Sequence, residues 1–210
     1  MRIVAACFAA AIVLAAAAPA SAEVRTVNAA PFTAIDASGP YRVNFLPGET
    51  HSVRLEGTQR NLDRTRVDVR NGVLRISQRC NFFCNSIGTL ATINVTAPAL
   101  SRAEASMGVD VRASGIAAER FTAEASMGGE LRLEGECGDL RAEASMGGML
   151  EATGLRCRTA SADASMGGSV EISASQSVNA EASMGGEVEV AGGPQQRTTA
   201  STMGGMISVR

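Results

Sequence analysis

One short phrase recurs six times in the second half of this 210-residue chain. Its methionines, Met107, Met127, Met146, Met166, Met184 and Met203, lie 20, 19, 20, 18 and 19 residues apart. The copies read AEASMG at 103–108, AEASMGG at 123–129 and 142–148, ADASMGG at 162–168, AEASMGG at 180–186 and ASTMGG at 200–205. This period is too short for the common helical repeats, whose units have about 33 residues or more. The repeat therefore predicts a stack of small, equivalent units.

The residues inside each unit alternate with a period of two, which is typical of a β-strand. Ala142, Ala144 and Met146 share one side of the third copy, whereas Glu143 and Ser145 share the other. The alternation resumes after the Gly-Gly pair, so each unit reads as a strand, a corner and a second strand. A single unit cannot bury the apolar faces of its strands, but a stack of parallel rungs about 4.8 Å apart can. We expect an all-β, right-handed parallel β-helix (β-solenoid) with rungs of about 19 residues and inward columns of Ala and Met. The alternative for the Met column is a soft stripe that contacts hydrophobic partners.

The composition excludes several classes of function. The chain has one His, His51, which we expect to be solvated, and its 19 Lys+Arg residues are all Arg. A single His excludes a multi-His metal site, and the absence of Lys excludes a Schiff base or a phosphate-binding loop lysine. The net charge of −2 and pI near 5.5 argue against a nucleic-acid partner. Aromatic residues make up 3% of the chain, which suits a narrow interior of small side chains.

The N-terminus has the pattern of a secretory signal peptide. Arg2 precedes an apolar run over residues 3–18, and Ala20-Ser21-Ala22 forms a small-x-small cleavage site. We expect residues 1–22 to be removed; the alternative is an uncleaved anchor, for which the run is slightly short. The expected location is the periplasm, the cell surface or the medium, with no transmembrane segment after cleavage.

Export leaves an even number of cysteines, which favours disulfides over free thiols. Cys137 lies nine residues before Met146, and Cys157 lies nine before Met166, so both occupy one slot on adjacent rungs. In-register neighbours fall within the Cα separation that a disulfide tolerates. We predict a Cys137–Cys157 disulfide, and a second one between Cys80 and Cys84 across a short loop.

Residues 23–100 have a different pattern, with short alternating runs between turn residues. The runs cover 41–45, 52–56, 66–69, 73–76 and 90–95, and Asn71-Gly72 separates two of them as in a hairpin. We expect a mainly antiparallel region that caps the first rung. It would continue directly into the solenoid of residues 101–210, so that the mature chain forms one domain.

The order of several short motifs resembles the head GIN domain family of auto-transporter adhesins. The motifs are Phe32-x-x-Ile35, Val43 with Pro47-Gly48, Val53-x-Leu55-x-Gly57, Asn61-Leu62, Gly72-x-Leu74-x-Ile76 and Pro98-x-Leu100, followed by the small-residue turns. The resemblance covers roughly residues 27–210. It implies an exported β-helical protein with an adhesive role and supplies no catalytic residues. Family members commonly have Gly-Ser-Gly-like turns where this chain has Ser-Met-Gly-Gly.

Two outward columns of the repeat are candidate binding residues. The acidic ladder comprises Glu104, Glu124, Glu143, Asp163 and Glu181, and the hydroxyl ladder comprises Ser106, Ser126, Ser145, Ser165, Ser183 and Thr202. Stacked carboxylates repel one another, and a bound Ca²⁺ ion or a basic partner would offset this repulsion. The alternative is that the side chains spread into water, where salt screens their charges. The two ladders could bind a glycan or another repetitive surface, or simply be small outward residues at a corner.

We therefore expect a non-enzymatic surface or envelope protein, adhesive or glycan-binding, with no cofactor except a possible Ca²⁺. The alternative is a structural protein that forms homo-oligomers by stacking through its open final rung, 192–210, where Ala200 replaces the acid. A third option, a polysaccharide hydrolase, needs two carboxylates and a shaped cleft. The repeat half has only Phe121 to shape one, and no nucleophile elbow or zinc spacing is present.

Overall fold

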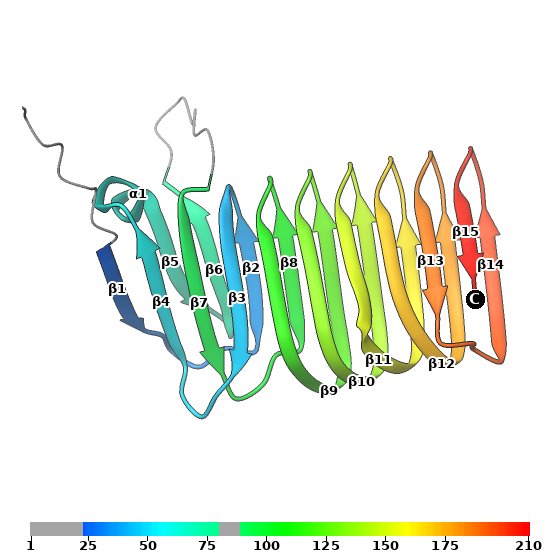
Figure 1. Cartoon of the computed structure of the whole chain (residues 1–210), viewed down its shortest axis with the longest axis horizontal. Coiled ribbons are helices and arrows are strands. Elements are labelled where there is room, and N and C mark those ends of the chain that lie inside the picture. Colours follow the sequence, from blue (N-terminus) through cyan, green and yellow to red (C-terminus); the bar gives the residue numbers. More distant parts are fainter. Residues whose placement is uncertain (1–22, 80–88) are drawn as a thin grey trace, which may run out of the picture.

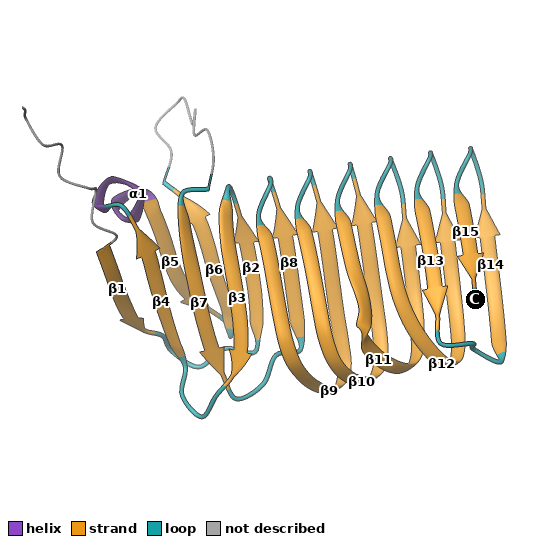
Figure 2. Ribbon diagram, in the orientation of Figure 1, coloured by secondary structure: helices purple, strands orange, loops and turns teal. Residues whose placement is uncertain are grey.

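The computed structural model describes residues 23–79 and 89–210. These residues form fifteen strands and one short helix, in an elongated stack (Figure 2). The predicted all-β solenoid is confirmed. The predicted signal peptide, residues 1–22, and the predicted Cys80–Cys84 disulfide lie outside the described residues.

Each turn of the solenoid consists of two facing strands joined by a tight turn at one edge and a broad curve at the other (Figure 1). Strand β8 (Arg102–Ser106) runs up the first layer, and β9 (Asp110–Ser126) runs down the second layer, curves and returns to the first. Strands β10 (Glu130–Ser145), β11 (Met149–Ala164) and β12 (Ser169–Ala182) repeat this path. The last turn is divided into β13 (Glu187–Ala191), β14 (Gln196–Ser201) and β15 (Met206–Val209).

All neighbouring strands of this stack pair in parallel, and the repeat copies are in register. Ala123 pairs with Ala142, Ala142 with Ala162, and Ala162 with Ala180. The register shifts fall between 132 and 135 and between 152 and 159, at or near the broad curve. Bulges there absorb the variation of the repeat between 18 and 20 residues, so the columns beside the tight turns stay aligned.

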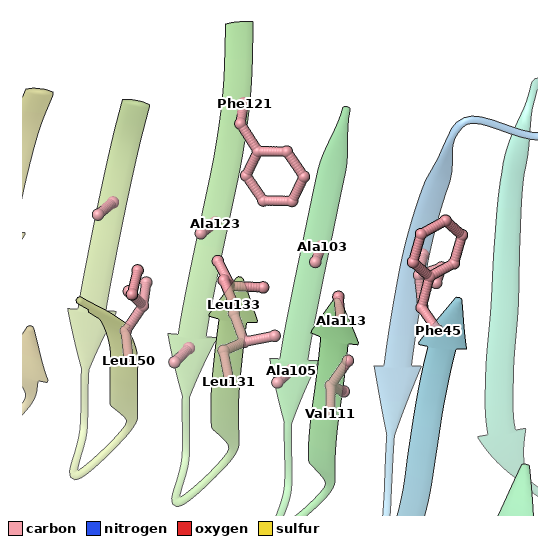
Figure 3. Close-up of a cluster of buried hydrophobic side chains, with 14 of the residues drawn as sticks. Phe45, Ala103, Ala105, Val111, Ala113, Phe121, Ala123, Leu131, Leu133 and Leu150 are labelled. Atoms are coloured by element: carbon pink, nitrogen blue, oxygen red, sulfur yellow. The ribbon is translucent and has the colours of Figure 1, made fainter. Parts of the chain in front are cut away.

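Small residues of one layer pack against larger residues of the other. Ala123 points inward from the first layer, and Leu131 and Leu133 point inward from the second (Figure 3). These three residues and Ala125 are buried. No polar or charged residue in the described ranges is buried. This pairing fills a narrow interior with few aromatic side chains, which accounts for the composition.

The expectation that the Met column faces the core is wrong. The six Met side chains of the repeat are 46% to 82% exposed. In each copy Met and the next Gly are the two central residues of a tight turn; Met127 and Gly128, for example, have φ of 49° and 72°. The Gly129 N–H donates to the Ser126 carbonyl oxygen at 2.9 Å and closes the turn. The strand alternation therefore ends at Ser126, and Met127 lies at the apex of the turn.

Five of the six corners have two glycines, and these have different functions; in the first corner Val109 follows Gly108. The first, such as Gly128, has a positive φ, and a Cβ added there would meet no atom within 4 Å. The second, such as Gly129, has an ordinary φ, but its Cβ would lie 2.4 Å from the carbonyl oxygen of Ala105 on the preceding rung. The second glycine thus lets successive rungs approach closely at the tight-turn edge.

The N-terminal strands are mixed, because part of this region already belongs to the parallel stack. Strands β2 (Ala34–Ser38) and β3 (Tyr41–Pro47) pair in parallel with β8 and β9. On their other side lie β6 (Val73–Gln78) and β7 (Ala91–Ala97), also parallel. Only β5 (Thr65–Arg70), β4 (Ser52–Gly57) and β1 (Glu23–Asn28) add antiparallel strands at the end.

The predicted hairpin at Asn71-Gly72 is confirmed, since it joins the antiparallel pair β5 and β6. Both turn residues have positive φ, 53° and 74°. Between β4 and β5 lies helix α1 (Gln59–Arg64), which the sequence analysis missed. The side chain of Thr58 caps this helix, and Leu62 is its fully buried residue.

The predicted Cys137–Cys157 disulfide is present. The two residues pair in register on β10 and β11, with a Cα–Cα separation of 4.5 Å. Both cysteines are buried. The disulfide ties two adjacent rungs together near the broad curve, opposite the tight turns.

The last rung differs from the others in its inward slots. Val178, Ala180 and Ala182 of β12 pair with Arg197, Thr199 and Ser201 of β14. The slots that are apolar throughout the preceding rungs are thus polar in β14. In the second layer Ile207 and Val209 keep the apolar character and are partly buried.

We predict that Gly129→Ala destabilises the fold by about 3 kcal/mol, because its Cβ would overlap backbone that can move only by separating two rungs. The matched control is Gly128→Ala, which costs about 1 kcal/mol for a positive φ in an open position. Urea unfolding measures both. Equal losses in the two variants would contradict this account of the second glycine.

We also predict that Met127→Asn stabilises the fold by roughly 0.5–1 kcal/mol, because Asn is favoured before Gly in a turn with two positive φ angles. Met127→Leu, which keeps an unfavoured residue at the same φ, should leave the unfolding midpoint nearly unchanged. A destabilising Asn substitution would mean that the Met side chain stabilises the turn.

Candidate functional site

The outer face of the first layer brings the two predicted ladders side by side. Strand register pairs Glu104 with Glu124, Glu124 with Glu143, Glu143 with Asp163, and Asp163 with Glu181. The hydroxyl ladder follows the same strands, two residues further along. A third column, two residues before the acids, comprises Arg102, Thr122, Arg141, Ser161, Asn179 and Thr198. We call these three columns the polar strip.

The polar strip extends one rung beyond the predicted residues. Asp36 pairs with Glu104, and Ser38 pairs with Ser106. Asp36-Ala37-Ser38-Gly39 matches the repeat phrase except for its missing Met, and this likeness could have revealed the extra rung from the sequence.

Arginines neutralise the N-terminal half of the acidic ladder. Arg102 donates to Glu104 of its own rung and, at 2.9 Å, to Glu124 of the next. Arg141 donates to Glu143 at 2.7 Å. The repulsion for which the sequence analysis invoked a Ca²⁺ ion or a basic partner is therefore offset here by the chain's own side chains.

The C-terminal half of the acidic ladder has no such counterions. Ser161, Asn179 and Thr198 occupy the slots in which Arg102 and Arg141 lie on earlier rungs. Within residues 23–79 and 89–210, Asp163 and Glu181 form no ion pair. Partial burial raises the pKa of Asp163, and the neighbouring carboxylates Glu181 and Glu143 raise it further against a smaller opposing effect of Arg141.

Glu124 shows that an arginine does not remove the effect of burial. Desolvation raises the pKa of Glu124, with Arg102 lowering it and Glu104 and Glu143 raising it. Both perturbed acids thus belong to the polar strip, in which the carboxylates are close enough to interact across rungs.

An open hollow lies beside the C-terminal half of the strip, toward the broad curve. It is lined by the polar residues Asp139, Thr159, Ser161, Ser177, Asn179, Gln196 and Thr198 and by the apolar residues Leu140, Ala160 and Val178. The hydroxyl of Thr159 donates to Asp139. This part of the strip combines neutral donors with the carboxylates of Asp163 and Glu181, which form no ion pair within the described residues, whereas Asp139 lies 4.0 Å from Arg120.

A further column of charged residues, which we did not predict from the sequence, lies on the outer face of the second layer. Five residues after each Met, register aligns Arg112, Arg132, Glu151, Glu171 and Glu189. Most of these charges are paired: Arg132 contacts Glu151 at 3.0 Å, and Arg210 contacts Glu189 at 3.0 Å. This column could have been found in the sequence, because these residues recur with the same period of about 19, five positions after each Met.

The other singled-out residues lie away from the strip. His51 is half-buried and not freely solvated: its ring packs edge-to-face on Phe32 with centroids 5.1 Å apart, and Nε2 lies 3.2 Å from the Phe32 carbonyl oxygen. Phe121 is buried in the core and shapes no cleft. The described residues contain no group of three or more His, Cys, Asp or Glu side chains arranged to hold a metal ion.

Comparisons with known proteins agree with the resemblance noted in the sequence. A family model described as "Putative auto-transporter adhesin, head GIN domain" matches residues 31–194. A putative adhesin from Bacteroides fragilis has a similar structure, with a TM-score of 0.72 at 15% identity, over 90% of this chain and 97% of that one. A putative adhesin from Parabacteroides distasonis aligns with a TM-score of 0.52 at 14% identity, over 91% and 98%. No curated protein matches the chain.

Asp163→Asn should stabilise the fold at pH 7 and have no effect near pH 3. A carboxyl whose pKa is raised by folding destabilises the native state above that pKa, and this penalty disappears below the unfolded-state pKa. The gain should be at most about 0.5 kcal/mol, because Asp163 is exposed and salt screens it. Unfolding curves across pH measure it.

The matched control is Glu143→Gln, which removes a carboxylate that Arg141 already neutralises. It should bring no gain at pH 7. An equal stabilisation by both substitutions would contradict the assignment of unpaired charge to the C-terminal half.

Proposed function

The chain belongs to the putative auto-transporter adhesin, head GIN domain family, and on this basis we propose that it is an exported, non-enzymatic surface or envelope protein with an adhesive role. The signal-peptide pattern of residues 1–22 supports export. No helix in the described ranges is long and apolar enough to cross a membrane. The two similar solved structures bear the description of adhesins.

The contact surface that we propose is the C-terminal half of the polar strip. Ser161, Asn179 and Thr198 supply neutral donors, and Asp163 and Glu181 supply acceptors, repeated about 4.8 Å apart along a flat face. Sugar hydroxyls both donate and accept hydrogen bonds, so they match this mixture of groups. The proposed ligand is an extended glycan of an envelope or cell surface.

The single observation that carries this proposal is the change of the third column from Arg102 and Arg141 to neutral groups while the acids continue. Paired charges would have to be separated before a glycan could use them, which costs free energy. Unpaired carboxylates beside hydroxyls and an amide have no such requirement. Calcium remains a proposed auxiliary ligand, bound by Asp163 and Glu181 together with sugar oxygens.

The same geometry supports a binding role over a hydrolytic one. A glycosidase places two carboxylates on opposite sides of the scissile bond, within a cleft. The acids of the polar strip stand in one column on one face, and Phe121 is buried. We therefore propose no catalytic residues.

Self-association through the last rung is the second candidate. Within the described residues, β14 and β15 each pair on one side only, which leaves sheet edges that could extend onto another chain. The polar inward slots of β14, with Arg197, Thr199 and Ser201, count against an apolar interface there. We rank this candidate below glycan binding, and light scattering over a range of concentrations tests it directly.

Binding of the purified protein to a glycan panel and to envelope polysaccharides, with and without Ca²⁺, tests the proposed contact surface. Asn179→Arg should weaken binding about tenfold or more, equivalent to about 1.4 kcal/mol, because it fills the neutral column with a cation that pairs Asp163 and Glu181. Glu171→Arg, on the opposite face of the same rung, should change affinity less than twofold.

Equal losses in both variants would contradict the assignment to the strip. An absence of binding at every salt and Ca²⁺ concentration would contradict the adhesive role itself.

A further inference from the structure

A row of methionines lines the tight-turn edge of the solenoid, one at the apex of each turn. The methionine row comprises Met107, Met127, Met146, Met166, Met184 and Met203. All six are at least 46% exposed, and all six have positive φ, between 48° and 56°. The tight turns stack along one edge, seen in Figure 1, so the side chains project from neighbouring rungs about 4.8 Å apart.

Folding does not explain these residues. A positive φ disfavours every residue with a Cβ, and Asn or Gly suits such a turn better, as Asn71-Gly72 shows in the same chain. An exposed apolar side chain gains little from burial. Six positions nevertheless combine an unfavourable backbone conformation with an exposed thioether, so the property that they share is the chemistry of the sulfur.

Thioether sulfur is a soft ligand that selects monovalent copper over hard cations. The unbranched Met side chain has several rotatable bonds, so two sulfurs on adjacent turns can converge on one ion. We propose that the methionine row binds soft monovalent metal ions of the copper(I) class, each held between thioethers of adjacent turns.

The charges beside the row favour a cation over an apolar or anionic partner. Asp163 and Glu181 stand three residues before Met166 and Met184, and Glu187 stands three after Met184. These three carboxylates form no ion pair within the described residues. They would repel an anionic lipid surface and lower the free energy of a cation at the turns. The pair Met166 and Met184 is therefore the strongest expected site.

This site is independent of the proposed glycan contact. The methionine row lies on the edge of the solenoid, and the polar strip lies on the flat face of the first layer. The two sites share only the nearby carboxylates Asp163 and Glu181, so substitution of the methionines should leave glycan binding intact.

The experiment is a silver(I) titration of the full chain in chloride-free buffer, followed by NMR of the methionine methyl groups, with all free thiols alkylated beforehand so that cysteine sulfur cannot contribute. A copper(I) titration against a colorimetric chelator, without oxygen, gives affinities. Wild type should bind more than one ion per chain, with shifts confined to the row. Replacing all six by Leu should abolish this binding, whereas Met149→Leu with Met206→Leu should not.

Replacing all six by Asn provides a variant in which unfolding cannot explain the loss, since Asn suits the turns. Two further variants keep only two thioethers of the row. Met166 with Met184, on adjacent turns, should bind at least tenfold more tightly than Met107 with Met184, which are about 19 Å apart. Unchanged binding in the Leu variant, equal affinities of the two pairs, or no binding by wild type at micromolar metal would each overturn the proposal.

Discussion

The close approach of successive rungs at the tight-turn edge determines the rest of this structure. At the five corners that have two glycines, the second glycine lies against a carbonyl of the preceding rung, as Gly129 does on Ala105 and Gly148 on Ala125. Backbone hydrogen bonds continue through the same point, since the Met149 N–H donates to the Gly129 carbonyl at 2.9 Å. A slip that brings the residue after the second glycine to this point would place a Cβ in that contact, which helps to hold the register where the repeat is most regular. Every sequence column consequently becomes a straight ladder.

Much of the fold could be predicted from the sequence, because residues at the same offset in each repeat lie side by side in the stack. The nine-residue offset of Cys137 and Cys157 from their methionines placed them in one slot, and they form the disulfide. The same logic failed for the methionines, because strand alternation was extended one residue into the turn. Met has no preference for a positive φ, so nothing local marked it as an apex. The comparison with Asn71-Gly72, which has the same conformation, was the available clue.

Other features depend on contacts that a single sequence does not reveal. The β2–β3 rung lies between β8 and β6 although four strands and a helix separate β3 from β8 in the chain, and no spacing rule predicts that order. The repulsion within the acidic ladder is neutralised by a side chain long enough to contact two rungs: the Arg102 guanidinium contacts the carboxylates of Glu104 and Glu124. The planar, multi-donor guanidinium suits such bridging better than an ammonium group, which is consistent with a chain whose basic residues are all Arg.

The solenoid constrains its inward slots and leaves its outward and apical slots free to vary. Stability in such a stack is approximately a sum over rungs and their interfaces, so an unfavourable turn weakens its own rung and little else. Buried apolar residues such as Ala123 and Leu131 can offset that local cost in each rung. Six strained, exposed methionines are thus compatible with a stable fold. Because the same unfavourable φ recurs at every one of these turns, the methionines are best explained by a property of the whole row and not of any single residue. Similarly, the acids form a continuous column that changes from paired to unpaired along the strip only because the rungs are in register.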